Sequence, residues 1–560
     1  MQLHAVEKIR SEPLPDSVDP IDFRRALAFM SLPPRSKEHM RRFTIPVALL
    51  LLTPLCAPIS MAASCKTPAD KVLDTSLRAL GGRKLLEGID AVELRANVAR
   101  NLLEQSIRPE GPWIQDMYQL QLTLDFRHER AHGTERRTSR LGWLAPPERP
   151  AAPVEYVVAD GIAANRAGDK LVPARQSLVQ DMQELLAFNP LQVLLTAAQA
   201  PDACLRGNEI LHGTGQDIVA WTWRDLKVRV LIDTNTHLPS EVAWSGPRPR
   251  DIFWNAWGDV DTRMHFENWS LRPNGLRVPS QWSYVRNGLP DQSWELGALE
   301  LATHLDPATW NLPSTLRDDI ARLPADVDSI PLGSSQSPPV EIAPGVVRIP
   351  GRWDVTLVRQ HDGVVVIEAP IGNGYSIRVL QEAASRFPGL PVKAVVTTSD
   401  AWPHIAGLRE YAARGIPIYA LDLNVAVVER LLRASHASRP DLLQRAPRGA
   451  RLHPIGSRTA IDSRENRVEL VPLRTAVGER QMLAWLPANR LVYTSDLVQP
   501  SGPKDWFAPE MLLELRQRLE AADIAPRHAY GMHYPPTAWN EMTGWLDAYL
   551  APEQDTVAAP

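Results

Sequence analysis

The stretch VVTTSDAWPHIAGL, residues 395–408, contains the pattern that decides the fold of the second half of the chain. It begins with an apolar run, passes through the polar residues 397–400, and turns apolar again on both sides of His404. A short apolar run bounded by polar residues is typical of a buried strand. We therefore expect a strand at 392–397 and a helix through 408–411, with His404 at the junction between them.

Strand and helix patterns alternate on both sides of this junction. The strand patterns are short apolar runs at residues 346–349, 355–358, 363–369 and 416–420. A helix with one apolar face is predicted by the spacing of Ile377, Leu380, Ala384 and Phe387. A second helix pattern starts at Asn424, and a hairpin is expected around residues 487–490. The order predicts an α/β region, residues 340–550, in which a sheet core is flanked by helices.

Two more segments of this region carry polar residues directly after predicted strands. The run QMLAWLPANRLVYTSD, residues 481–496, reads as a hairpin that ends in Asp496. The run YGMHYP, residues 530–535, contains a glycine two residues before His533.

Together, these three segments resemble the metallo-β-lactamase superfamily of αββα metallo-hydrolases. In that family, the strand-to-helix junction carries His-x-His-x-Asp-His followed by a glycine. Laid on this motif, the first three ligand positions are Ser399, Ala401 and Pro403, and only His404 is retained. Asp496 fills the position of the family's metal-bridging aspartate, and His533 fills that of its last ligand.

The resemblance implies that one of the family's two metal sites is lost. That first site is normally three histidines, and its third position falls on Val477, with Arg474 nearby. Alanine and valine cannot coordinate a metal, and serine offers at most one weak ligand. His404, Asp496 and His533 all belong to the second site, so the resemblance implies either one bound Zn²⁺ or Fe²⁺ ion or no ion. Asp400 is the nearest replacement carboxylate.

Two functions remain open at this point. The first is a hydrolase with a reduced metal site, in which His404 and Asp496 are catalytic and a metal-bound water attacks an ester, amide or phosphoester. The alternative is a catalytically inactive binding module that acts on an envelope ligand or partner. In that case, His404 and His533 are satisfied histidines at strand ends, and Asp496 caps a turn. A serine hydrolase, with Ser399 activated by His404 and oriented by Asp496, is chemically conceivable but lacks a nucleophile-elbow glycine pattern.

The first half of the chain, residues 66–325, is predicted to be mostly antiparallel β. Alternating apolar residues mark strands at 118–126 and 226–232, and a hairpin turns at 272–275. One helical interval is expected near 177–200. The pattern resembles the half-barrel domain of LolA-like lipoprotein carriers, which implies a concave apolar surface for acyl chains; the alternative is a sheet that packs on the second domain. The polar, proline-rich segment 326–339 reads as a linker.

The N-terminus has the order of an export signal, with basic residues, then an apolar stretch, then small residues over 40–62. Residues 1–39 are then either a wrongly assigned start or a disordered extension. An exported chain is expected in the periplasm, where Cys65 and Cys204 remain after cleavage. Cys65 has two possible fates, a disulfide with Cys204 or lipidation, which would anchor the chain to a membrane.

Charge and composition exclude one class of partner. The formal net charge is -4, and no basic run is interleaved with aromatic residues, so nucleic acid is not an expected partner. The partner is expected to be a small molecule or an envelope component, and no transmembrane helix is expected in the mature chain. Four other histidines match no ligand spacing and are expected to face solvent: His361, His436, His453 and His528.

Overall fold

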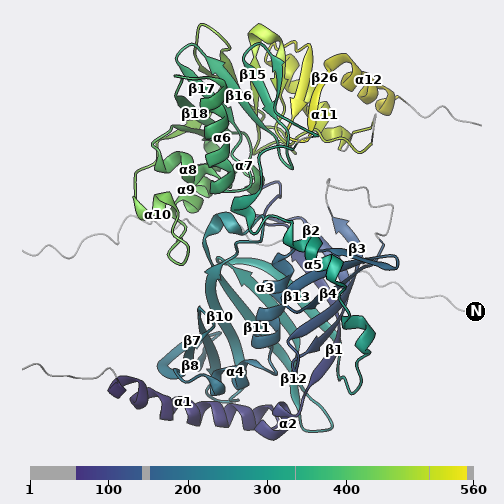
Figure 1. Cartoon of the computed structure of the whole chain (residues 1–560), viewed down its shortest axis with the longest axis vertical. Coiled ribbons are helices and arrows are strands. Elements are labelled where there is room, and N and C mark those ends of the chain that lie inside the picture. Colours follow the sequence, from purple (N-terminus) through teal and green to yellow (C-terminus); the bar gives the residue numbers. More distant parts are fainter. Residues whose placement is uncertain (1–58, 142–151, 335, 503–504, 507, 552–560) are drawn as a thin grey trace, which may run out of the picture. The chain divides into compact units, whose positions relative to one another are not determined.

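The computed structural model describes residues 59–141, 152–334, 336–502, 505–506 and 508–551 (Figure 1). Residues 58–560 form one compact unit. The predicted extension 1–39 and most of the predicted signal 40–62 lie outside the described residues. The division into 66–325, 326–339 and 340–550 stays a prediction, because the compact unit spans all three ranges.

A single antiparallel sheet of thirteen strands dominates the first half of the chain, in the order β6-β5-β4-β3-β2-β1-β13-β12-β11-β10-β9-β8-β7. Its strands are β1 Ala91–Asn101, β2 Gln115–Asp125, β3 Arg130–Leu141, β4 Val154–Ala159, β5 Ile162–Ala167, β6 Lys170–Pro173, β7 Cys204–Leu211, β8 Thr214–Trp223, β9 Leu226–Asp233, β10 Pro239–Pro247, β11 Asp259–Leu271, β12 Arg277–Arg286 and β13 Leu289–Leu301. The strands and the hairpin predicted from alternation are confirmed. In that hairpin, Phe266 of β11 lies opposite Trp282 of β12.

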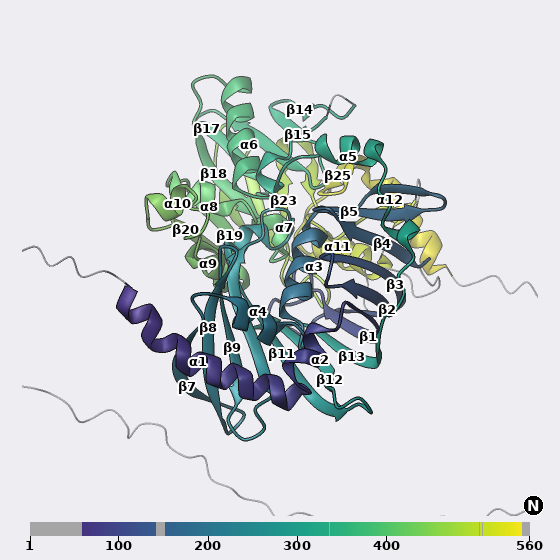
Figure 2. The ribbon, with the colours of Figure 1, turned by 60° about the horizontal axis from the view of Figure 1, so that its bottom comes forward.

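Helices cover the apolar face of this large sheet. They are α1 Ile59–Leu80, α2 Arg83–Glu87, α3 Ser177–Phe188 and α4 Val193–Gln199. Their apolar residues share one core with the strands, because a half-buried sheet must cover its apolar face. Figure 2 shows α1 crossing the strands from β7 towards β12. The likeness to LolA-like half-barrels stays a prediction.

The second half of the chain contains two sheets. The first has the order β14-β15-β16-β17-β18-β19-β20 and the second β21-β22-β23-β24-β25-β26. The first comprises β14 Val340–Ala343, β15 Val346–Ile349, β16 Val355–Gln360, β17 Gly363–Ile367, β18 Val392–Thr397, β19 Ile418–Leu421 and β20 Leu452–Ile455. The second comprises β21 Thr459–Ile461, β22 Val468–Pro472, β23 Met482–Leu486, β24 Leu491–Tyr493, β25 His528–Gly531 and β26 Tyr534–Ala538. The chain is therefore α/β with large antiparallel sheets.

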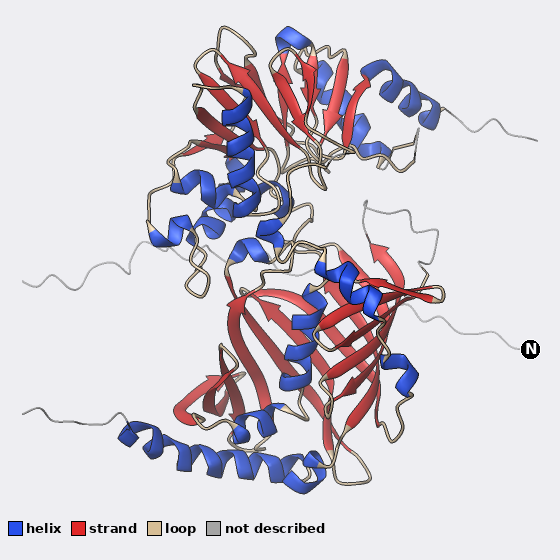
Figure 3. Ribbon diagram, viewed as in Figure 1, coloured by secondary structure: helices blue, strands red, loops and turns tan. Residues whose placement is uncertain are grey.

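The two sheets form the inner layers of this half, with helices on both outer faces, and three apolar clusters hold these layers together. One cluster joins the inner faces of the sheets, for example Val365 of β17 with Met482 of β23. A second joins the other face of the seven-stranded sheet to α6, α8 and α9, and a third joins the six-stranded sheet to α11 and α12 (Figures 1 and 3). The helices of this half are α6 Asn373–Arg386, α7 Trp402–Ile405, α8 Leu408–Ala413, α9 Val425–Arg433, α10 Leu442–Arg445, α11 Pro509–Ala521 and α12 Trp539–Leu550.

The segment between the two halves is packed rather than loose. Helix α5, Ser314–Ala321, precedes it, and a short 3-10 turn, Val327–Ser329, begins it with a capping box at Asp326. Val327 is buried, and the Asp328 carboxylate accepts a hydrogen bond from the Gly374 amide at the start of α6. The polar residues of the predicted linker therefore bind the chain that follows them. Further 3-10 turns lie at Asn255–Trp257, Pro307–Trp310, Asp422–Asn424 and Pro487–Asn489.

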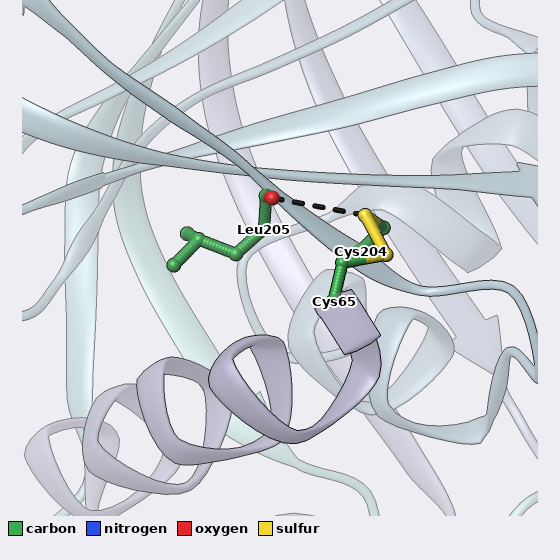
Figure 4. Close-up of a disulfide and its surroundings, with 3 residues drawn as sticks. All are labelled: Cys65, Cys204 and Leu205. Carbon is green, nitrogen blue, oxygen red and sulfur yellow. Dashed lines mark hydrogen bonds between the residues drawn. A yellow bond between two sulfur atoms is a disulfide. The ribbon is translucent and has the colours of Figure 1, made fainter. Parts of the chain in front are cut away.

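A disulfide joins Cys65 of α1 to Cys204, the first residue of β7, across a separation of 139 residues (Figure 4). One of the two fates predicted for Cys65 is thus confirmed, and its sulfur is not free for a lipid in this structure. Within the described ranges, every helix is too short or too polar to span a bilayer.

Candidate functional site

Four titratable side chains meet where strands of the two inner sheets end. Glu368 follows β17, His404 lies in α7 after β18, Asp496 lies just beyond β24, and His533 lies in the turn between β25 and β26. Strand β17 is parallel to β18, and β24 is parallel to β25, so within each pair the carboxyl ends lie at the same edge. The structure therefore brings together the three residues predicted from sequence and adds Glu368.

The four side chains form a chain of alternating carboxylates and imidazoles. His404 Nδ1 lies 2.9 Å from Glu368 Oε2, and His404 Nε2 lies 3.6 Å from Asp496 Oδ2. His533 Nε2 lies 2.9 Å from the other oxygen, Asp496 Oδ1. The 3.6 Å contact is too long for a hydrogen bond, so the buried Nε2 of His404 has no hydrogen-bond partner among the described residues.

Burial divides this cluster into a closed end and an open end. The side chains of Glu368 and His404 are 0% exposed, Asp496 is 10% exposed and His533 is 26% exposed. Any ligand from solvent thus meets His533 first. Gln499 also donates to Asp496 Oδ1 at 2.8 Å, so this oxygen already has two partners.

Two residues at the cluster have uncommon backbone angles. Glu368 has φ 77° and Ser495 has φ 59°, in the left-handed region that residues with a Cβ rarely adopt. Such strain clusters at functional sites because the surrounding structure must enforce it. Gly531 is required by close packing, since a Cβ there would lie 2.5 Å from the Tyr534 ring.

Hydroxyl groups hold Glu368, the residue that the sequence reasoning missed. The Thr398 hydroxyl donates to Glu368 Oε1 and lies 2.7 Å from the Ser495 hydroxyl. The sequence contained a sign of this residue, because Glu368 is an acid that directly follows a run of valines and isoleucine. The apolar pattern predicts a buried strand over 363–369, which includes Glu368, and does not indicate a functional role for this acid.

Electrostatics keep His404 charged inside the protein. Burial alone disfavours the charged imidazole, but the carboxylates of Glu368 and Asp496 outweigh it and raise the pKa of His404 to about 10. Burial also disfavours the Asp496 carboxylate, yet the two imidazoles hold the pKa of Asp496 well below its ordinary value. At neutral pH, a protonated His404 therefore lies next to an ionised Asp496.

No family model and no curated protein matches this chain. Among solved structures, it is similar to a metallo-beta-lactamase from Pontibacter korlensis, at 15% identity and a TM-score of 0.29, over 37% of this chain and 98% of that one. It is also similar to the stereoselective inverting sec-alkylsulfatase Pisa1 from Pseudomonas sp., at 15% identity and a TM-score of 0.28, over 38% of this chain and 41% of that one. The chain thus spans less than half the length of the alkylsulfatase. Likeness at this level carries no argument about activity.

Three other residues considered for the metal motif make contacts outside the cluster. The Val477 amide donates to Glu514, and Arg474 pairs with Asp422 at 2.5 Å. Asp400, the predicted replacement carboxylate, bonds to the Ser399 hydroxyl at 3.5 Å. Burial raises the pKa of Asp400 to about 7. Among the described residues, Asp400 makes no ion pair with His404 or His533.

A serine-hydrolase arrangement is not formed. The Ser399 hydroxyl accepts from the Ala401 amide and contacts Asp400, while both ring nitrogens of His404 face carboxylates. The predicted pairing of Ser399 with His404 is therefore absent, because the imidazole lies between Glu368 and Asp496.

The three predicted metal ligands converge, but in this arrangement they bind one another. Among the residues that the structure describes, no group of three or more His, Cys, Asp or Glu side chains has an arrangement that could hold a metal ion. Asp496 Oδ1 is taken by His533 and Gln499, and its Oδ2 faces His404. These contacts do not fit a resident ion, and the presence of one stays a prediction.

Residues from the first half of the chain support the helix that carries His404. Trp402 is buried, and its ring lies 4.7 Å from the Trp254 ring and 4.9 Å from the Trp257 ring. The Trp402 amide donates to the Glu104 carbonyl at 2.9 Å. These contacts span long separations in sequence, so no local pattern could have indicated them.

The expectation that His436 faces solvent is wrong. This residue is 6% exposed and lies 3.8 Å from Asp441, and burial lowers its pKa. It packs against Gly258, where a Cβ would lie 2.5 Å from the imidazole. The polar residues around His436 in sequence suggested exposure, but the distant segment at 256–259 covers it.

Proposed function

We propose that this chain is a binding module built on a metallo-β-lactamase-type scaffold, in which a buried ion-pair cluster stands where the family holds its metals. The ligand is an envelope component that meets the cluster at His533. The αββα layering and the order of the three sequence segments support the scaffold. The activity proposed is recognition rather than hydrolysis.

One observation carries this proposal, namely that the retained side chains contact one another directly. Two imidazoles contact the two oxygens of Asp496, and Glu368 balances His404 from behind. A buried charge is tolerated when it is paired and hydrogen-bonded, and each carboxylate of the cluster already has an imidazole 2.9 Å away. The partly exposed His533 leaves one imidazole able to bind a ligand.

Metal analysis tests the proposal. The mature protein is stripped with a chelator, reloaded with Zn²⁺ or Fe²⁺, dialysed and measured for bound metal. We expect well below one ion per chain. The triple variant Ser399→His, Ala401→His and Pro403→Asp restores three of the four missing ligands, all but the one at Val477, and is expected to gain metal that the parent lacks.

Two matched variants serve as controls for the metal analysis. His533→Ala removes a cluster residue, whereas His528→Ala removes a histidine of the neighbouring strand β25 that lies outside the cluster. A parent chain that holds one ion per chain, lost in His533→Ala and kept in His528→Ala, would contradict the proposal. Turnover of generic esters or phosphoesters by the parent would also contradict it.

A hydrolase with a single metal is the second candidate, and one observation favours it. His404 Nε2 is buried without a hydrogen-bond partner, while Nδ1 is held by Glu368 at 2.9 Å. A metal-binding histidine typically has its second nitrogen fixed by a carboxylate in this way. The same metal analysis separates the candidates, because stoichiometric binding lost in His533→Ala is expected only for this one.

We also propose that the chain is exported and acts in the periplasm. The Cys65–Cys204 disulfide supports this, since such bonds persist in oxidising compartments and are rare in the bacterial cytosol. Intact mass of periplasmic protein tests it. Removal of 40–62 with a mass two protons lower than the reduced chain is expected. A diacylglyceryl mass on Cys65 would instead indicate an exported lipoprotein, whereas a chain that retains 40–62 and has two free thiols would contradict export.

A further inference from the structure

Arg430 on α9 is a half-buried cation without a paired carboxylate. Among the described residues it makes no salt bridge, and its buried Nε has no hydrogen-bond partner. Its guanidinium lies over the Trp257 ring, 4.8 Å from the centroid. Burial lowers the pKa of Arg430, which reflects the cost of holding this charge away from water.

Two fully buried arginines, in contrast, are paired with carboxylates. Arg409 binds Asp441 through two nitrogens and donates to three backbone carbonyls. Arg248 binds both Asp181 and Glu184. A guanidinium has five N–H donors and is not deprotonated in proteins, so Arg430 carries donors that no described protein group uses. An uncompensated charge of this kind marks a candidate binding site.

Arg430 lines a cavity of about 340 Å³, together with Trp257, Asn287 and Arg433. Asp259 also lines it, but its carboxylate already accepts from the Ser435 hydroxyl at 2.9 Å and the Ser438 amide at 3.2 Å. Arg433 pairs with Glu429 on the surface at 3.1 Å. These donors leave the charge of Asp259 in place, but two arginines, Arg430 and Arg433, line the cavity against this one carboxylate, so its lining carries a net positive charge.

Glu110 is the carboxylate whose charge acts on Arg430, and it too has a partner. Its Oε2 lies 2.8 Å from Arg480, and its side chain is 59% exposed. A more exposed carboxylate pairs weakly because water screens it. An anion in the cavity would therefore gain a charge-assisted contact that the chain itself does not supply.

We infer that this cavity binds a small oxyanion, a carboxylate, sulfate or phosphate group, held by the fork of Arg430 with Asn287 and Arg433 at its rim. The site is separate from the His404 cluster and does not depend on whether that cluster binds metal. The cavity is linked to the helix that carries His404, because Trp257 contacts both Arg430 and Trp402. A bound anion would fix Trp257 and stiffen the helix that presents His404.

Titration of the full mature chain with anions tests the inference. Sodium sulfate, sodium phosphate and sodium succinate are each titrated at constant ionic strength against sodium chloride, with thermal unfolding and calorimetry as readouts. We expect saturable binding of at least one anion and a rise in Tm. Tighter binding of succinate than of either inorganic ion assigns an organic carboxylate, and the reverse assigns a free inorganic anion.

Variants place the binding at Arg430. Arg430→Gln removes the charge and is expected to weaken binding at least tenfold, while Arg464→Gln, an exposed arginine elsewhere, leaves it unchanged. Arg430→Lys keeps the positive charge but lacks the planar guanidinium, so it should bind the anion with intermediate affinity. This variant also tests the inference if Arg430→Gln folds poorly. No saturable binding to the parent, or equal affinity in the parent and both Arg430 variants, overturns the inference.

Discussion

The large sheet and the two-sheet region each bury a cluster of charged side chains, but the clusters use different cations. In the large sheet, Arg248 is 3% exposed and pairs with Asp181 at 2.9 Å and with Glu184. Arg286 lies 3.4 Å from Asp291 and 3.5 Å from Asp181. At the ends of the inner strands of the second region, the cation is an imidazole between two carboxylates.

This difference separates a structural cluster from a candidate functional one. A guanidinium stays charged at every pH at which a protein folds, so the arginines of the large-sheet cluster do not gain or lose a proton. An imidazole can gain or lose a proton, and the chain of contacts from Glu368 ends at His533, which solvent reaches. Backbone strain at Glu368 and Ser495 occurs beside the imidazole cluster. Both clusters are deeply buried, so burial does not distinguish them. The titratable imidazoles are what identify the candidate functional site.

The largest effect is expected from the disulfide, which constrains only the first half of the chain. In the chain-entropy model, closing a loop of 139 residues stabilises the folded state by about 4–5 kcal/mol. The double variant Cys65→Ser, Cys204→Ser should lose up to that amount in urea unfolding followed by circular dichroism. Zinc content should not change, because Glu368 and His404 lie far from the bond in sequence and in packing. An unchanged free energy of unfolding would contradict the prediction.

The next largest effect is expected from breaking either buried cluster. Glu368→Ala leaves a protonated His404 with one carboxylate partner, and loss of one member of a buried pair costs about 3–5 kcal/mol. Arg248→Met leaves Asp181 and Glu184 buried without their cation and should cost a similar amount. Urea unfolding measures both, and Glu382→Ala, which removes the partner of Arg386 near the surface, should cost less than about 1 kcal/mol. Equal effects of all three variants would remove the distinction between buried and surface pairs.

How far the sequence predicts this site can be judged residue by residue. His404, Asp496 and His533 each follow an apolar run. Such runs predict strands, so the sequence indicates that these three residues lie just after strand ends. Glu368 lies within the predicted strand 363–369, and the apolar pattern of that strand does not distinguish it as a site residue. The burial of His436 and the packing of Trp254 and Trp257 on Trp402 depend on segments more than a hundred residues apart. Local periodicity has no information about such contacts, so those features needed the structure.

A pH series distinguishes the two clusters further. The pKa of His404 is raised from 6.5 to about 10 in the folded chain. Its contribution to stability is therefore complete below pH 6.5 and is lost as the pH rises towards 10. Between pH 7 and 9, the free energy of unfolding should fall by roughly 2–3 kcal/mol from this residue. The fall should be absent in His404→Gln and retained in Arg248→Met, as measured by urea unfolding at each pH. An identical slope in the parent and His404→Gln would show that the imidazole is not held charged.

The smallest effect is expected at the open end of the imidazole cluster. His533→Ala removes the imidazole and its contact with Asp496 Oδ1, but Gln499 still donates to that oxygen. Because His533 is 26% exposed, water can replace part of the lost contact, and the cost should be about 1 kcal/mol. Urea unfolding measures it beside His528→Ala, which should be neutral. A cost as large as that of Glu368→Ala would mean that His533 holds the fold together, and its role as the open, ligand-facing end of the cluster would then fail.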